Sequence, residues 1–251
     1  MRRPLIGGNW KMNGTTKHAA GFIEEIGSVL SPGERPEVVV FPPFTLIAGL
    51  SEAATAAGVL LGGQDLFWEE EGAFTGEVSP GMLKDAGCTW FLAGHSERRH
   101  VIGENDGIVR RKLRAGISSG LNGILCVGEL REEREAGMTE EVVRRQISAG
   151  VSDLDVSPSG LVIAYEPVWA IGTGLTATPG EAQRVHSLIR CWMADIAGSE
   201  FAEKLRIIYG GSVNPGNAAA IMEEADVDGA LVGGASLSAG SFAGIVAASG
   251  S

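Results

Sequence analysis

The sequence predicts an α/β protein folded as a single (β/α)8 barrel, with residues 1–251 forming one domain. Eight short apolar runs recur along the chain, separated by longer stretches with helical spacing. Eight units in 251 residues average about 31 residues each, the size expected for a barrel of about 250 residues. Polar or glycine residues follow most of the runs, and the carboxyl ends of the strands are where such barrels carry their chemistry.

The eight apolar runs are the expected strands. Because they are continuous rather than alternating with polar residues, both faces of each strand are expected to be buried, as in parallel sheets. In chain order the runs are residues 5–6, 38–41, 59–61, 90–93, 124–127, 161–165, 207–209 and 230–232.

Helices are expected between these runs. Residues 22–30 and 185–196 carry apolar side chains at intervals of three and four. The second stretch has a strong start signal, with Thr178 as N-cap, Pro179 in the first position and Glu181 in the first turn. Periodicity does not distinguish a closed sheet from an open one, so a doubly wound open sheet is the alternative. The glycines are scattered and no linker marks a domain boundary.

Composition excludes several classes of protein. The formal net charge of −11 argues against a general binder of nucleic acid or of membrane surfaces. No stretch approaches the ~20 apolar residues of a membrane span, and the run after Arg2 and Arg3 is too short for a signal peptide. Cys88, Cys126 and Cys191 are widely spaced without a CxxC pair, which disfavours a disulfide framework and a structural zinc site. A cytoplasmic location is expected.

Two cationic or titratable side chains stand at strand ends. Lys11 follows the first run, where it would place an ammonium group in a pocket; a solvated surface charge is the alternative. His95 follows the fourth run, and its alternative is a hydrogen-bonded structural imidazole. The other three histidines lie in helical or charged stretches and are expected at the surface: His18, His100 and His186.

Glu166 is a more specific candidate. It leaves the sixth run directly before Pro167, which disfavours helix at that point. Desolvation at the mouth of a barrel can raise the pKa of a carboxyl group toward the range that suits a general base. An ion pair at the edge of the core is the alternative.

Glycines mark three further segments. Residues 210–212 and 233–234 end the seventh and eighth runs, where barrels frequently bind phosphate through backbone N–H groups. Ordinary turns after strands are the alternative. Residues 172–177 match the dinucleotide-binding glycine pattern in form, but the first glycine comes too long after the strand for that fingerprint.

Six motifs in the sequence resemble those of one known family. They occur in the same order as in that family and are distributed over nearly the whole chain. Residues 9–13 (NWKMN), 94–99 (GHSERR), 126–129 (CVGE), 164–174 (AYEPVWAIGTG), 209–213 (YGGSV) and 231–235 (LVGGA) closely resemble triosephosphate isomerases.

The resemblance implies an aldose-ketose isomerase of glycolysis and gluconeogenesis that interconverts dihydroxyacetone phosphate and D-glyceraldehyde 3-phosphate. Glu166 would be the base that moves a proton between adjacent carbons, and His95 the neutral electrophile that polarises the carbonyl. Lys11 would place positive charge beside the enediolate and the phosphate. Asn9 would orient Lys11, and Glu97 would hold it.

The same resemblance implies how the phosphate is bound. Ser212, Gly233 and Gly234 would offer backbone N–H groups, joined by Gly172 in a lid that runs from Pro167 to Thr178. The lid would keep the enediol phosphate from losing its phosphate in water. No cofactor and no metal are implied.

The resemblance also implies a homodimer, formed through a loop from Asp65 to Ser79 with Thr75 near its tip. Two positions depart from the common family pattern. Leu175 replaces a lid lysine of many relatives, and Asp65 follows Gln64 where an asparagine is usual. In this acidic loop we expect like charges and burial to raise the pKa of Asp65 at the subunit interface.

Two other functions stay open. One is a paralogous isomerase of a four-carbon ketose phosphate, although residues 9–11 and 172–174 favour the triose. The other is an inactive barrel that serves as a binding module, although the joint presence of Lys11, His95 and Glu166 argues against it.

Overall fold

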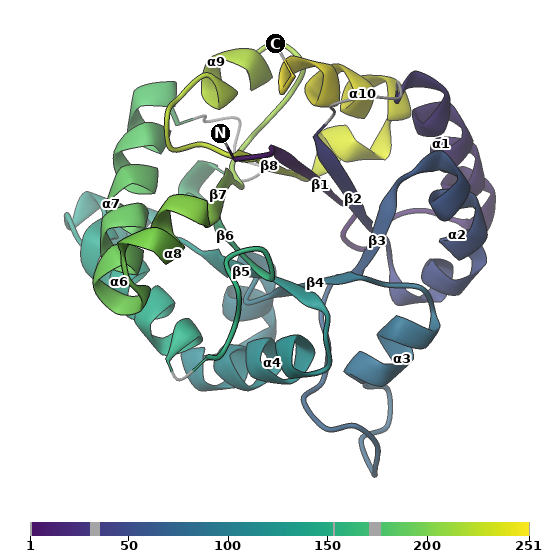
Figure 1. Cartoon of the computed structure of the whole chain (residues 1–251), viewed down its shortest axis with the longest axis horizontal. Coiled ribbons are helices and arrows are strands. Elements are labelled where there is room, and N and C mark those ends of the chain that lie inside the picture. Colours follow the sequence, from purple (N-terminus) through teal and green to yellow (C-terminus); the bar gives the residue numbers. More distant parts are fainter. Residues whose placement is uncertain (1, 31–35, 153, 171–176, 251) are drawn as a thin grey trace.

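The computed structural model describes residues 2–30, 36–152, 154–170 and 177–250. Its strands pair in parallel and in chain order, and the last strand pairs with the first to close a barrel. Helices surround this barrel on its outside (Figure 1). The predicted fold class is therefore confirmed, and closure rules out the open doubly wound sheet.

The eight strands lie close to the apolar runs of the sequence. They are β1 Leu5–Asn9, β2 Glu37–Phe41, β3 Leu60–Gly63, β4 Trp90–Ala93, β5 Asn122–Val127, β6 Leu161–Tyr165, β7 Arg206–Tyr209 and β8 Gly229–Val232. The third strand is shifted from the expected residues 59–61 and continues through two glycines.

The described helices fill the intervals. The α-helices are α1 Thr16–Val29, α2 Phe44–Ala57, α3 Pro80–Asp85, α4 Asp106–Ser118, α5 Arg131–Glu135, α6 Thr139–Val151, α7 Pro179–Ala197, α8 Ser199–Lys204, α9 Ala218–Met222 and α10 Ala239–Ala248. Three short turns of other helical types are η1 Arg98–Ile102, η2 Val168–Ala170 and η3 Gly234–Leu237. No described helix is long and apolar enough to cross a membrane.

The start of α7 forms as the sequence predicts. The Thr178 hydroxyl accepts a hydrogen bond from the Glu181 N–H at 3.2 Å, and the Glu181 carboxylate accepts one from the Thr178 N–H at 2.8 Å. This reciprocal capping box satisfies two N–H groups that the helix leaves unpaired.

Apolar side chains fill the molecule in two layers. A small cluster inside the barrel contains Phe41, Trp90, Leu92 and Ile124 among its members. A larger cluster packs the outer faces of the strands against the helices. Because both faces of every strand are covered, the carboxyl rim of the barrel is left as the place where polar side chains gather.

The segment from Asp65 to Ser79 projects from the barrel beside α3 (Figure 1). Its base is closed by a hydrogen bond from the Phe67 N–H to the Val78 carbonyl at 2.8 Å. The Phe67 ring stacks on Trp68, with ring centroids 4.0 Å apart, and lies 4.5 Å from that of Phe74.

Candidate active site

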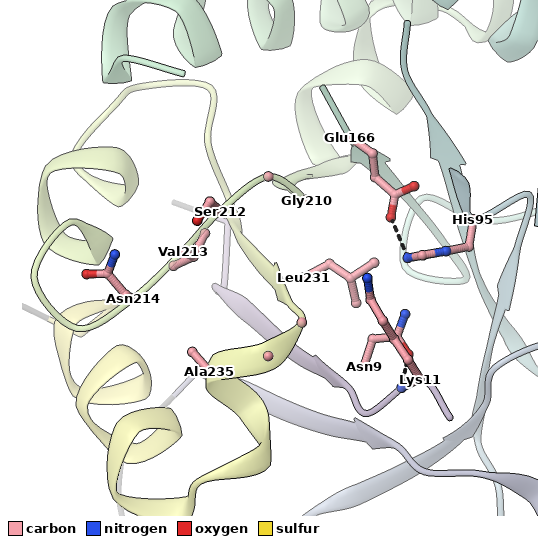
Figure 2. A pocket seen from close by; sticks show the side chains of 13 residues that line it. Asn9, Lys11, His95, Glu166, Gly210, Ser212, Val213, Asn214, Leu231 and Ala235 are labelled. Carbon is pink, nitrogen blue, oxygen red and sulfur yellow. Dashed lines mark hydrogen bonds and ion pairs between the residues drawn. The ribbon is translucent and has the colours of Figure 1, made fainter. Parts of the chain in front are cut away.

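A cavity of about 360 Å³ opens at the carboxyl rim of the barrel. Strand ends from both halves of the chain contribute to it. Its lining is Asn9, Lys11, His95, Glu166, Gly210, Gly211, Ser212, Val213, Asn214, Leu231, Gly233, Gly234 and Ala235 (Figure 2).

Lys11 is held in an unusual backbone conformation. Its φ of 52° lies in the left-handed region, and it is the only residue other than glycine with positive φ in the described ranges. The Asn9 Oδ1 accepts a hydrogen bond from the Lys11 N–H at 3.0 Å, and the Gln64 Nε2 donates to the Lys11 carbonyl at 2.8 Å. Such strain persists where surrounding contacts over-determine the backbone, and it is concentrated at functional sites.

The ammonium group of Lys11 is positioned as well. Its Nζ lies 2.6 Å from the Glu97 Oε1, and its side chain is 26% exposed. Glu97 is absent from the cavity lining, so it contacts Lys11 from outside. The structure therefore does not support the alternative that Lys11 is a solvated surface charge.

The neighbours of His95 define its tautomer. The backbone N–H of Glu97 lies 3.2 Å from the His95 Nδ1. Because a backbone N–H can only donate, Nδ1 is the acceptor and carries no proton, which leaves the proton of the neutral ring on Nε2. This Nε2 faces the Glu166 Oε1 at 3.3 Å across the cavity (Figure 2).

Glu166 is 2% exposed and follows β6 directly. Its Oε2 accepts a hydrogen bond from the Ser96 N–H at 2.9 Å. Its own N–H donates to the Val127 carbonyl at 2.7 Å, so the residue still pairs with β5 although the strand has ended. Glu166 is thus held at the rim through both its carboxylate and its backbone.

Two glycines make room for Glu166. A Cβ on Gly128 would lie 1.7 Å from the Glu166 carbonyl oxygen, and one on Gly210 would lie 2.7 Å from its Cγ. Real Cβ atoms essentially never show contacts this short. Close approach of the neighbouring backbones, which only glycine permits, therefore sets the position of this carboxylate.

Cys126 also adjoins Glu166. The thiol is completely buried, and burial raises its pKa well above the ordinary value, with the negative charge of Glu166 acting in the same direction. Cys126 therefore stays protonated beside the carboxylate. Neither Cys126 nor Ser96 was among the predicted site residues, although both lie within the family motifs.

The loops after β7 and β8 form the far wall of the cavity. The Asn217 Nδ2 donates to the Ser212 carbonyl at 3.0 Å. The N–H and hydroxyl of Ser236 both donate to the Gly233 carbonyl, at 2.8 and 2.7 Å. These bonds fix the loops that carry Ser212, Gly233 and Gly234, and the fixed loops offer N–H groups suited to an anion. Asn214 also lines this wall and was not predicted.

The remaining candidates are placed as follows. Gly172 and Leu175 lie outside the described residues. Thr75 is exposed in the projecting loop. No group of three or more His, Cys, Asp or Glu side chains among the described residues could hold a metal ion.

Asp65 differs from its expected role. It is 4% exposed and contacts Lys112 Nζ at 2.6 Å and Arg98 Nη2 at 2.9 Å, so it turns into its own chain rather than toward a facing acid. Glu104 shares the same Lys112 Nζ, also at 2.6 Å. Burial raises the pKa of Asp65 to about 6, with Lys112 opposing the shift and Glu104 adding to it. The pKa is raised as expected, and burial is the largest cause, but the burial and the like charge of Glu104 come from this chain itself rather than from a facing subunit.

Comparison with known proteins shows the family to which the chain belongs. The family model for triosephosphate isomerase matches residues 4–249. The chain is 51% identical over 247 residues to the triosephosphate isomerase of Trichlorobacter lovleyi and 52% identical over 247 residues to that of Moorella thermoacetica, covering 98% of this chain and of each relative. Identity to the enzyme of Acidithiobacillus ferrooxidans is 49% over 244 residues, covering 96% of this chain and 95% of the relative.

Proposed function

This chain belongs to the triosephosphate isomerase family and interconverts dihydroxyacetone phosphate and D-glyceraldehyde 3-phosphate, and from that premise we propose how its residues divide the work. The observation that carries the proposal is the pairing of a buried carboxylate with a neutral imidazole across one cavity, with Glu166 Oε1 3.3 Å from His95 Nε2. Both side chains line the same cavity, so a substrate that replaces this contact would meet a base and an N–H donor together.

Glu166 is the proposed base. It removes a proton from the carbon next to the carbonyl and returns it to the adjacent carbon, so that an enediolate forms and then collapses. Its burial keeps water away from the carboxylate. The Ser96 N–H donates a hydrogen bond to the charged carboxylate before it takes up the proton.

His95 and Lys11 stabilise the oxygen on which charge develops. The His95 Nε2–H donates to that oxygen, because its Nδ1 is already occupied by the Glu97 N–H. The Lys11 ammonium adds positive charge beside the enediolate and the phosphate. Donors fixed before the reaction stabilise developing charge more than mobile water does, since they need not reorganise.

Asn9 and Glu97 position Lys11. The Asn9 side chain accepts a hydrogen bond from the backbone N–H of Lys11, and the Glu97 carboxylate accepts one from the Lys11 Nζ. The phosphate is received by the N–H groups of Ser212, Gly233 and Gly234, and the family resemblance adds Gly172.

We also propose a homodimer. Large apolar side chains are exposed in four segments: Met12 at 94%, Phe74 at 43%, Met82 at 55%, and Val101 and Ile102 at 78% and 63%. A second copy of the chain would remove such apolar surface from water. A second copy that receives the loop from Asp65 to Ser79, with Thr75 near its tip, would cover these side chains. Sedimentation at equilibrium tests this, and a monomer at micromolar concentration would contradict it.

A cytoplasmic location remains a proposal, supported by three free cysteines, two of which are buried.

No observation favours a four-carbon ketose phosphate or an inactive barrel. A coupled assay of the purified protein, with chelator present, compares triose and tetrulose phosphates. Turnover of the triose phosphate with little turnover of the tetrulose phosphate is expected, and the reverse preference would contradict the proposal.

A further inference from the structure

Arg134 of α5 contacts side chains on both sides of residues 171–176. On the preceding side, its guanidinium lies 3.7 Å from the ring centroid of Trp169, in η2. On the following side, its Nη2 lies 2.5 Å from the Glu181 Oε1, in the first turn of α7. One side chain thus contacts both flanking segments.

The contact with Trp169 is part of a larger arrangement. The Trp169 Nε1 donates to the Glu129 Oε1 at 2.9 Å, and the Tyr165 hydroxyl donates to the same carboxylate at 3.1 Å. Glu129 is fully buried. The indole is therefore anchored at its edge by Glu129 and covered on its face by Arg134, in a cation–π geometry that favours a planar cation.

The contact with Glu181 reaches the other flank. The Glu181 Oε2 accepts hydrogen bonds from the N–H and the hydroxyl of Thr178, at 2.8 and 3.0 Å, while Oε1 receives Arg134. The two carboxylate oxygens thus divide between the helix start and the guanidinium. The Thr178 N–H and then Arg134 lower the pKa of Glu181, so the pair is charged at neutral pH.

A nearby ion pair lacks this arrangement. The Arg184 Nη1 contacts the Glu140 Oε1 at 2.9 Å, and it joins α7 to α6 beside the same small cavity that Arg134 lines. Both of its side chains are more than half exposed, and among the described residues Arg184 does not stack on an aromatic ring. Exposed pairs of this kind contribute little to stability, so Arg184 is a matched control of equal charge.

We propose that Arg134 is a positioning residue for the isomerase reaction: by stacking on Trp169 and pairing with Glu181, it fixes the two flanks of residues 171–176 relative to one another and favours reprotonation of the enediolate over loss of its phosphate. The inference rests on the proposed function. Arg134 does not touch the cavity that holds Glu166, so it acts only through the flanks.

The competing reaction is an elimination. From the enediolate, the electron pair on oxygen reforms a carbonyl, the C=C bond shifts, and the C–O bond to phosphate breaks with its pair leaving on inorganic phosphate. The enol that remains takes up a proton on carbon to give methylglyoxal. The rate of elimination rises relative to reprotonation when the phosphate end of the enediolate is held less firmly.

The test compares Arg134→Gln, Arg134→Lys and Arg184→Gln with the wild type, measuring isomerisation and release of inorganic phosphate from the same triose phosphate. For Arg134→Gln we expect the share of substrate lost to phosphate to rise about fivefold and kcat to fall about tenfold, with KM within about twofold. Arg134→Lys should change the phosphate loss and kcat less than Arg134→Gln does, because lysine keeps the positive charge but not the planar stacking. Arg184→Gln should resemble the wild type.

The inference would be overturned if folded Arg134→Gln lost the same fraction of substrate to inorganic phosphate as the wild type. It would also be overturned if Arg184→Gln raised that fraction as much as Arg134→Gln does. Glu181→Gln provides a second variant if Arg134→Gln does not fold: the glutamine keeps the capping box but loses the ion pair, and its phosphate share should rise in the same way. Wild-type protein that isomerises no triose phosphate would instead defeat the proposed function, so the two failures are distinguishable.

Discussion

The carboxylate of Glu166 is bonded to the backbone of Ser96, the residue directly after His95, with the Ser96 N–H 2.9 Å from the Glu166 Oε2. The proposed base is therefore anchored to the loop that carries the proposed electrophile. The two side chains come from β6 and from the loop after β4, on opposite parts of the chain, yet one hydrogen bond fixes the distance between them. Positions that disturb either end of this bond should affect turnover more than stability.

Gly210→Ala tests the space around Glu166. A Cβ at this position would lie 2.7 Å from the Glu166 Cγ, so the carboxylate should move. We expect kcat to fall about tenfold, because misplacing a catalytic group by a fraction of an ångström weakens proton transfer. Steady-state kinetics checks this against Gly180→Ala, where a Cβ would meet nothing within 4 Å. Equal kcat values in the two variants would show that Gly210 is not needed for the position of Glu166.

Lys11→Met removes the ammonium group while keeping an unbranched side chain. Both KM and kcat should worsen, since the charge meets the phosphate in the ground state and the enediolate in the transition state, with a combined loss of about a hundredfold or more in kcat/KM. The measurement is steady-state kinetics at constant ionic strength. Unchanged values of both constants would place Lys11 outside the reaction.

Asp65→Asn should alter how stability depends on pH. Burial raises the folded pKa of Asp65 to about 6 from an ordinary value of 3.8, so the folded state binds this proton more tightly than the unfolded state. The contribution of the protonated group is complete below the unfolded pKa and is lost as pH rises through the folded pKa. Relative to the wild type, the free energy of unfolding of Asp65→Asn should gain about 2 kcal/mol between pH 4 and pH 7.

Urea unfolding at constant protein concentration measures that difference, because the stability of a dimer depends on concentration. Lys112 keeps Glu104 as a partner at 2.6 Å in the variant, so the substitution does not leave it alone. A difference that does not change with pH, or that falls as pH rises, would contradict the assignment of the raised pKa to Asp65.

Much of the fold was predictable because buried parallel strands produce continuous apolar runs. The first and third strands were exceptions. Each continues through two glycines beyond its expected residues, and glycine does not contribute to an apolar pattern. Lys11, His95 and Glu166 were predictable because closure of a barrel brings the carboxyl ends of all strands to one rim.

Contacts between distant segments were not predictable in this way. The tautomer of His95 depends on a backbone N–H that turns back toward its ring. The inward turn of Asp65 depends on Lys112, 47 residues later. His186 was wrongly expected at the surface: it is 0% exposed, and burial lowers its pKa to about 4. Its helix has a wide buried face, whereas His18 and His100 are exposed as predicted.

Glu166→Gln tests the central claim most directly, because it removes the base while leaving nearly the same shape and the phosphate wall intact. The measurement pairs the isomerisation rate with the inhibition constant of glycerol 3-phosphate, which carries the phosphate but has no carbonyl. We expect a loss of activity of about a thousandfold or more, with binding of glycerol 3-phosphate within about tenfold of the wild type. Retention of more than a few per cent of the wild-type rate, in a variant that still binds the analogue, would contradict it.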